Sequence, residues 1–352
     1  LPLGSEVTAI DDVPMAKLIK RCTPFIRSDG LNMTLKYRQL SDEFALHHFL
    51  LGGKKTVFEV EYLPPGTKEK KTTKLTAISN RHLTKRLINR HSAPENLRNY
   101  GFRMLDETTG LLTANSFDFG LKKKGRKKYR EFLKKTFEEL QTNNSKHLII
   151  DVRLNEGGYV GYESQLFSYL AKKPFREAKS SIAKTLDIPL EKHLDKKEFF
   201  RGVERAVEKS LNKEFKKVGD AYHVIDEKNK LYKPKANGFS GKVYFLISGC
   251  TFSGGTVLCS LALQNDNVTF IGEETGGGHE FYTAGNMVLY SLPNTQCQLE
   301  VPMIRYQNDL PEGMFPKGSG VRPKHRVIQT QADFITGRDT VMEFTRTLIK
   351  MK

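Results

Sequence analysis

Alternation of apolar and polar residues is clearest in the first 80 residues of the chain. The stretch TVFEVEYLPPG, residues 56–66, alternates and then ends in a Pro-Pro-Gly turn, which predicts a β-strand. TTKLTAI, residues 72–78, predicts its hairpin partner. Earlier, SEVTAIDDVPMAKLIKRCTPFI, residues 5–26, predicts a strand, a turn and a helix in that order. We therefore expect residues 1–80 to form a small α+β or partly open barrel module.

After residue 100 the pattern changes to strands that alternate with amphipathic helices. KHLIIDV, residues 146–152, is almost continuously apolar, as expected for a strand that is buried on both faces of a sheet. Predicted strands cover residues 110–120, 146–152, 241–248 and 268–272, and predicted helices cover residues 128–144, 162–173 and 254–263. Strand–helix alternation of this kind predicts an α/β core around a mostly parallel sheet.

Two polar stretches and a tail complete the predicted organisation. Residues 81–100 are interpreted as a polar linker, and residues 175–240 as a highly charged insertion with weak helical patterns that covers a cleft. The tail predicts strands at residues 287–292 and 298–306 and a final helix at residues 339–352. The expected domains are thus a module at 1–80 and a core at 101–352 that carries the insertion.

The composition is that of a globular protein with a strongly basic surface. The chain has 352 residues, of which 38% are hydrophobic and 28% charged, so it can bury a core without disulfide or metal support. None of its apolar runs is long enough to span a bilayer. The net charge is +17, and the densest basic run is KKKGRKKYR, residues 122–130. Because the nearby Phe132 also fits the apolar stripe of the following helix, we interpret this run as a solvated helix start and expect no nucleic-acid partner.

The stretch ISGCTFSGGTVLCSLALQNDN, residues 247–267, places hydroxyls, a thiol and glycines between a predicted strand and a predicted helix. Ser253 either caps that helix or acts as a nucleophile, since serine is favoured in both places. A helix N-terminus offers free N–H groups and positive potential to an oxyanion, and Gly254 leaves its N–H unobstructed. Cys250 is a rival nucleophile, but it precedes the helix by several residues and gains less from it. We therefore favour Ser253.

A second glycine turn, in DVRLNEGG at residues 151–158, follows the predicted buried strand. Parallel strands end at the same edge of a sheet, so Gly157 or Gly158 could supply a second oxyanion donor near Ser253. Asp151 and Arg153 fit a structural role better, as a carboxylate at a strand end and an arginine that pins a loop.

A third glycine turn, in GEETGGGHE at residues 272–280, follows the next strand. Its glycines would shape the wall of the same site. Glu273 and Glu274 could orient a catalytic base, although carboxylates in loops are usually just solvated.

The three motifs HLIIDVRLNEGG, KVYFLISGCTFSGGT and VTFIGEETGGG, in that order, resemble the core of the C-terminal-processing (tail-specific) serine peptidase family. That family includes tricorn-type peptidases and the interphotoreceptor retinoid-binding proteins. The resemblance extends from Gly101 to the end, and LPLGSEVTAIDDVPM at residues 1–15 resembles the PDZ-like module that often precedes such a core. It implies the ClpP/crotonase-like α/β fold, Ser253 as nucleophile, and an oxyanion hole from Gly254 and either Gly157 or Gly158.

The resemblance also implies what the protein binds and where it works. It implies a polypeptide substrate, with the PDZ-like module taking a segment such as a C-terminus by strand addition, and it implies no metal or organic cofactor. Relatives are often exported, which implies an extracytoplasmic location, although the chain carries no signal peptide. The chain begins at Leu1 without an initiator Met, so we expect it to be part of a longer protein. No feature of the sequence predicts an oligomeric state.

The catalytic base is where the sequence departs from the lysine-dyad branch of this family. Gly278 stands where that branch has its Lys, in an FGKG-like motif. The TGGG sequence instead resembles the branch in which a His serves as base, in an Asp-x-His motif upstream of the PDZ-like module. Within this chain the candidate histidines are, in order of preference, His279, His325, His47 and His48. Lys317 stands where tricorn-type enzymes have a Glu, so a catalytically inactive binding protein on the same fold is the alternative function.

Overall fold

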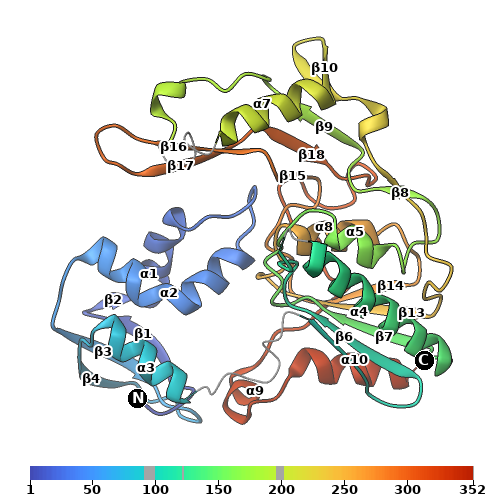
Figure 1. The fold of residues 1–352 in the computed structure, drawn as a ribbon. Helices are drawn as coiled ribbons and strands as arrows, with labels where there is room; N and C mark the ends of the chain where they lie inside the picture. Colours follow the sequence, from blue (N-terminus) through green and yellow to red (C-terminus); the bar gives the residue numbers. More distant parts are fainter. Residues whose placement is uncertain (91–99, 121–122, 196–201, 352) are drawn as a thin grey trace.

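The computed structural model describes residues 1–90, 100–120, 123–195 and 202–351. Figure 1 shows an N-terminal unit in blue, a central sheet with its helices, and a second sheet above them. No helix within these ranges is long and apolar enough to cross a membrane.

The N-terminal unit combines an antiparallel sheet with two helices. Across the described residues the sheet has the order β2-β1-β3-β4, with strands β1 (Glu6–Ile10), β2 (Val13–Pro14), β3 (Val57–Leu63) and β4 (Lys71–Thr76). Between β2 and β3 lie α1 (Met15–Cys22), the 3-10 helix η1 (Thr23–Phe25) and α2 (Thr34–Gly52). Cys22, Ile26 and Leu40 form a small hydrophobic core. The predicted hairpin is confirmed, because β3 pairs antiparallel with β4.

The central sheet is parallel except at one edge. Its order over the described part of the chain is β19-β14-β13-β7-β6-β5, and β5 runs antiparallel to β6. The strands are β5 (Tyr100–Met104), β6 (Thr109–Ala114), β7 (His147–Asp151), β13 (Lys242–Ile247), β14 (Val268–Gly272) and β19 (His325–Arg326). Because β6, β7, β13 and β14 all end at one edge, the loops that follow them meet there. The predicted α/β core is confirmed.

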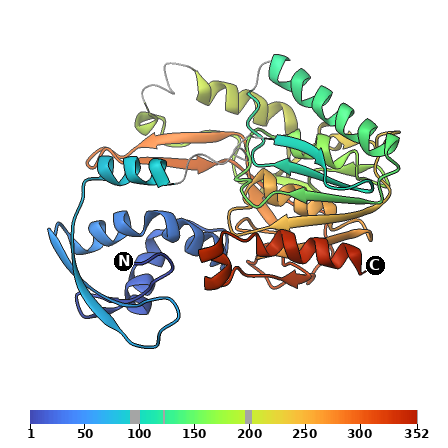
Figure 2. The same ribbon diagram turned by 90° about the horizontal axis from the view of Figure 1, so that it is seen from below.

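Successive side chains of these strands point to opposite faces of the sheet and pack into two separate hydrophobic layers. Ile150 and Phe245 pack with helices on one face, whereas Ile149 and Leu246 pack against the C-terminal helix on the other. The helices are α4 (Lys123–Thr142), α5 (Tyr162–Phe167) and α8 (Gly254–Ala262) on the first face, and α9 (Gln331–Thr336) and α10 (Thr340–Lys350) beyond the sheet. Figure 2 shows α9 and α10 in red beside the sheet. The helix predicted at residues 162–173 is shorter than expected, since α5 ends at Phe167 and turns follow it.

The second sheet joins the predicted insertion to the tail. Its order within the described residues is β10-β11-β9-β18-β15, and β18 pairs antiparallel with β9. In separate two-stranded sheets, β8 pairs with β12 and β16 pairs with β17. The elements of this part of the chain are β8 (Phe175–Arg176), β9 (Ser180–Ala183), η3 (Glu191–His193), α7 (Val203–Glu214), β10 (Phe215–Val218), β11 (Ala221–Val224), η4 (Asp226–Lys228), β12 (Leu231–Tyr232), β15 (Phe281–Thr283), β16 (Met287–Ser291), β17 (Gln298–Pro302) and β18 (Ile304–Gln307). Ile188, Leu211 and Ile304 belong to its own hydrophobic cluster. Residues 175–240 thus contain short strands besides the weak helical patterns expected there.

The predicted linker is partly helical. Helix α3 (Asn80–Arg90) covers its first half, and residues 91–99 lie outside the described part. The helix was missed because its sequence, NRHLTKRLINR, is mostly polar and has few apolar residues to set a period.

Candidate active site

Ser253 occupies a strained turn between β13 and α8. Its φ is 49° and its ψ is −125°, a region that residues other than glycine rarely adopt. Its side chain makes no capping hydrogen bond, although the residue stands at the N-cap position of α8. Such conformations cost on the order of 1–3 kcal/mol and cluster at functional sites. A serine on a strained strand-to-helix turn is also the geometry that presents a nucleophilic Oγ in α/β-hydrolases.

Buried hydrogen bonds hold this turn in place. The Thr251 hydroxyl donates to the carbonyl of Val152 at 2.8 Å and accepts from the N–H of Ser248 at 3.0 Å. The Thr256 hydroxyl donates to the carbonyl of Thr251 at 2.9 Å. These bonds tie the turn to the end of β7 and to α8, so the surroundings impose the unusual φ of Ser253.

Gly157 packs directly against Ser253 and the first residue of α8. A Cβ on Gly157 would lie 2.7 Å from Ser253 Cβ, 2.9 Å from Ser253 Oγ and 2.9 Å from the nitrogen of Gly254. No side chain fits there, and the φ of 99° also requires glycine. The structure therefore brings together the two glycine turns that the sequence predicted to meet.

The two glycines of this turn differ in what their N–H groups do. The N–H of Gly157 donates to Asn155 Oδ1 at 2.8 Å, and Asn155 is fully buried. Gly158 instead lies opposite Phe117, in a bridge whose hydrogen bonds use the N–H groups of Phe117 and Tyr159. This bridge leaves the N–H of Gly158 unused. The N–H of Gly254, the first residue of α8, likewise has no acceptor within its helix.

The third glycine turn lies behind Ser253, as predicted. A Cβ on Gly277 would lie 3.2 Å from the nitrogen of Ser253 and 2.5 Å from Thr256 Oγ1. The N–H of Gly278 donates to Asp29 Oδ2 at 2.9 Å, so a residue of the N-terminal unit contacts this loop. Burial raises the pKa of Asp29.

None of the candidate histidines hydrogen-bonds to Ser253 within the described residues. His279 is buried, its Nδ1 lies 2.7 Å from the carbonyl oxygen of Ser319, and its ring packs edge-on against Phe315. His325 lies in β19, while His47 and His48 lie on α2. The structure therefore places His279 beside the glycine loop, with its Nδ1 directed to Ser319.

Cys250 lies in the same turn but in a less favourable electrostatic setting. Burial raises the pKa of its thiol; the charge of Arg38 lowers it, but Glu156 and Glu273 act with burial and the pKa stays raised. A thiol that stays protonated is a poor nucleophile. This observation favours Ser253 over Cys250.

Asp151 and Arg153 form an ion pair, which fits the structural role that the sequence favoured for both residues. Arg153 donates to Asp151 Oδ2 at 2.7 Å and to Asp339 Oδ1 at 2.7 Å, and Asp339 caps α10. Burial opposes the charge of Arg153, but the hydrogen bonds to both carboxylates outweigh it and raise its pKa. Through these two ion pairs, Arg153 joins the end of β7 to the start of α10.

Glu273 and Glu274 are engaged in contacts with other parts of the chain. Glu273 forms an ion pair with Arg38 of α2. Glu274 Oε1 accepts from the N–H of Gly320 at 2.8 Å and from Asn32 Nδ2 at 3.1 Å. Neither carboxylate is bonded to a histidine among the described contacts. Lys317 is exposed.

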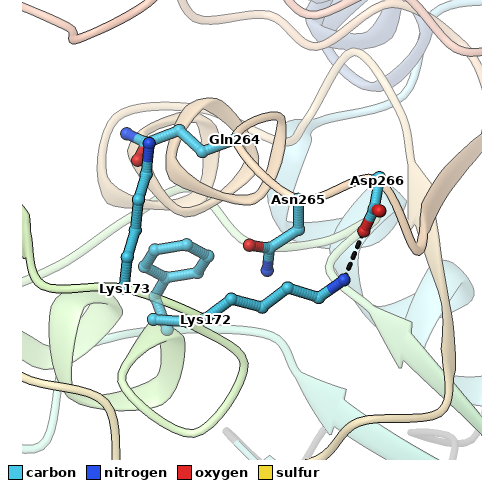
Figure 3. Close-up of a pocket in the computed structure, with 7 residues that line it drawn as sticks. Lys172, Lys173, Gln264, Asn265 and Asp266 are labelled. Carbon is cyan, nitrogen blue, oxygen red and sulfur yellow. Dashed lines mark hydrogen bonds and ion pairs between the residues drawn. The ribbon is translucent and has the colours of Figure 1, made fainter.

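Two cavities lie near these elements without enclosing Ser253. A cavity of about 680 Å³ at the sheet edge is lined by residues that include Arg153, Cys250 and Asp339. A smaller one of about 340 Å³ lies at the far end of α8, where Lys172 pairs with Asp266 (Figure 3). The second cavity contains none of the predicted site residues.

Comparisons with known proteins point to one family. The model of a family described as peptidase family S41 matches residues 108–327. No curated protein sequence matches the chain. Among solved structures, mature CPAF is 16% identical with a TM-score of 0.58, covering 95% of this chain and 74% of that one.

Two further structures resemble the chain. CPAF complexed with lactacystin is 15% identical with a TM-score of 0.57, covering 99% of this chain and 78% of that one. The photosystem II D1 C-terminal processing protease is 14% identical with a TM-score of 0.39, covering 92% of this chain and 63% of that one. At these identities the CPAF structures establish a shared fold, which confirms the predicted fold class.

Proposed function

The chain belongs to peptidase family S41, and we propose that it is a serine peptidase that hydrolyses peptide bonds through an acyl-enzyme on Ser253. The observation that carries this proposal is the strained φ of Ser253 at the start of α8, with a side chain that caps nothing. A serine kept only as a cap would have relaxed backbone angles and a hydrogen bond to the first helical turn. The packing of Gly157 against Ser253 Oγ supports the same assignment.

The oxyanion hole is assigned to the N–H groups of Gly254 and Gly158. The N–H of Gly254 stands at the positive end of α8, where negative charge is stabilised. The N–H of Gly158 is left out of the bridge with Phe117, whereas the N–H of Gly157 is engaged by Asn155. In this assignment Gly157 has no catalytic N–H, and its lack of a side chain lets the turn that carries it pack against the Ser253 turn.

The reaction follows from these placements. Ser253 Oγ attacks the carbonyl carbon of the substrate while a base takes its proton, and the carbonyl oxygen becomes an oxyanion between the two N–H groups. Return of the proton to the leaving amine breaks the C–N bond and leaves an ester on Ser253. Water, deprotonated by the same base, then releases the carboxylic acid and restores the serine.

The base is assigned to a histidine outside the described residues, in the Asp-x-His motif that the family resemblance places upstream of the PDZ-like module. The Nδ1 of His279 is bonded to the carbonyl of Ser319, and no described histidine is hydrogen-bonded to Ser253. The competing proposal is a catalytically inactive binding protein on the same fold.

The N-terminal unit is assigned a peptide-binding role like that of a PDZ-like module. β4 forms an edge of its sheet, and most of its side chains are exposed. An extended polypeptide, including a C-terminus, could add to that edge as a further strand.

The test is labelling with a fluorophosphonate probe, mapped by mass spectrometry, on this chain and on the full-length protein. Label on Ser253 in either form, and its absence from Ser253→Ala, would establish an activated serine. Cys250→Ala is the matched control and should label normally. Absence of label from both folded forms would overturn the proposal in favour of the binding protein.

A further inference from the structure

A buried carboxyl group lies close to Gly254, whose N–H is assigned to the oxyanion hole. Glu163, in the first turn of α5, is 2% exposed. Its Oε1 accepts a hydrogen bond from the N–H of Gly161 at 2.9 Å. Its Oε2 lies 3.7 Å from the position that a Cβ on Gly254 would take, and no described donor reaches that oxygen. Glu163 thus contacts both the loop that carries Gly158 and the start of α8.

A second carboxyl group shares this buried site. Glu177 follows β8, and its Oε2 accepts from the Ser164 hydroxyl at 2.8 Å. The hydroxyl of Tyr282 lies 3.5 Å from its Oε1. Burial raises the pKa of Glu163 well above its ordinary value, and the charge of Glu177 raises it further. Burial also raises the pKa of Glu177.

The groups around the pair favour charge on Glu177 rather than on Glu163. The pKa of Glu177 is lowered by hydrogen bonds from Ser164, Glu163 and Tyr282 and, to a smaller extent, by the charge of Lys230. On Glu163 the N–H of Gly161 and the residue's own backbone N–H lower the pKa, but burial and the charge of Glu177 outweigh them. The other titratable groups facing the pair are phenols, whose pKa values burial raises, so they stay neutral: Tyr129, Tyr232, Tyr282 and Tyr306. These surroundings favour the charge of the pair on Glu177 and the proton on Glu163.

We propose that Glu163 is a positioning residue of the peptidase, which must be protonated for the oxyanion site beside it to work. This inference rests on the proposed function. A neutral Glu163 holds the Gly161 turn against α8 and leaves the positive potential at the Gly254 N–H intact. An ionised Glu163 places a negative charge in a low-dielectric interior next to the forming oxyanion, and the two charges repel.

The test is the pH dependence of kcat and KM for the full-length protein. We expect kcat of the unchanged protein to fall about tenfold per pH unit on the alkaline side, with little change in KM, as Glu163 loses its proton. Glu163→Gln has the same shape and no charge, so its alkaline fall should disappear. Glu177→Gln removes the charge that raises the pKa of Glu163, so Glu163 ionises sooner and the fall should move to lower pH. A purely structural role would neither remove the alkaline fall in Glu163→Gln nor move it to lower pH in Glu177→Gln.

Controls separate this inference from the proposed function. Glu156→Gln removes the same charge from an exposed position next to Gly157, and it should leave the alkaline limb in place. An unchanged limb in Glu163→Gln, or an equal effect of Glu156→Gln, would overturn the role of Glu163 while Ser253 still labels. Loss of labelling in the unchanged protein would instead overturn the proposed function itself. If thermal unfolding shows that Glu163→Gln does not fold, Glu177→Gln tests the proposal instead. A shift of its alkaline limb to lower pH supports the proposal, and an unchanged limb overturns it.

Discussion

Asn32 Nδ2 donates to the carbonyl oxygen of Thr275 at 2.9 Å, and so joins the N-terminal unit to the glycine turn behind Ser253. Asn32 is 2% exposed, and its Oδ1 accepts from the N–H of Leu35 at 3.1 Å. The same segment is close enough that a Cβ on Gly276 would lie 2.8 Å from Leu35 Cβ. The turn that backs the serine is therefore shaped partly by residues near the start of the chain.

Asn32→Ala should weaken this junction. It leaves the carbonyl of Thr275 buried without this donor, so the free energy of unfolding should fall by about 1–3 kcal/mol. The rate at which a fluorophosphonate labels Ser253 should fall as well, because the turn behind the serine loses its support. Urea unfolding and labelling kinetics measure the two effects. Ser5→Ala, which removes an exposed hydroxyl from the same unit, should change neither.

Ser253→Gly should stabilise the protein while abolishing its reactivity. Glycine adopts the φ of 49° without strain, so the free energy of unfolding should rise by about 1 kcal/mol. If Ser253 were a cap, Ser253→Ala would instead cost about 1 kcal/mol. Thr330→Ala is the matched control, because Thr330 does cap α9 through Asp333. Denaturant unfolding of the three variants distinguishes the two roles.

Gly157→Ala should abolish labelling of Ser253. The new Cβ would meet Ser253 Cβ at 2.7 Å, so the serine or the glycine turn must shift, and a misplaced nucleophile loses at least about 100-fold in rate. Gly219→Ala tests whether backbone strain alone explains the loss. Gly219 also has positive φ, at 60°, but nothing lies within 4 Å of its Cβ position. Normal labelling is expected for Gly219→Ala, and equal loss in both variants would contradict the steric explanation.

Cys250 should react slowly with iodoacetamide near neutral pH. Burial raises the pKa of its thiol, so the reactive thiolate is scarce until the pH rises. The exposed Cys297 serves as the internal comparison and should be alkylated first. Mass spectrometry of partly alkylated protein gives both rates. Faster modification of Cys250 would mean that the turn is more open than the structure indicates.

Arg153→Met should destabilise the fold in a pH-dependent way. Burial alone would raise the pKa of Asp339, but the hydrogen bond and charge of Arg153 outweigh it and lower that pKa. A lowered carboxyl pKa gives stability that is present above the unfolded value and is lost as the pH falls through the folded value. The variant should thus lose about 1–3 kcal/mol at neutral pH, and the difference from the unchanged protein should shrink toward about pH 3. Urea unfolding across that range measures it, and a constant difference would contradict the assignment.

The sequence predicted those features that depend on local pattern. The buried strand at residues 146–152 and the helix that buries Leu133 and Phe137 follow from periodicity, and both are present. Ser253 was found because a strand, a glycine-rich turn and a helix follow one another in a short stretch. The meeting of the Gly157 turn with the Ser253 turn was predicted because parallel strands end at the same edge of the sheet.

Other features depend on residues that only the folded chain brings together. In the sequence Glu163 and Glu177 are ordinary polar residues, and their burial arises only when α5 packs against α8 and Ser164 bonds to Glu177. Asn32 meets Thr275 across most of the chain length. The strands of the insertion were not predicted, because β9 is short and its partner β18 lies far along the sequence. No periodicity within residues 175–240 could reveal such a partner.

The pairing of β9 with β18 has a consequence for the order in which the protein folds. These two strands flank β13, α8 and β14 in the sequence, so their pairing closes a long loop that contains the serine turn. Closing such a loop is entropically costly, and pairings between distant segments form slowly. The turn that holds Ser253 uses contacts from inside this loop and also contacts with Val152 and Gly157, which precede β9. We therefore expect nascent or partly folded chains to carry an unreactive serine, so that reactivity arises only after the last long-range strands have joined.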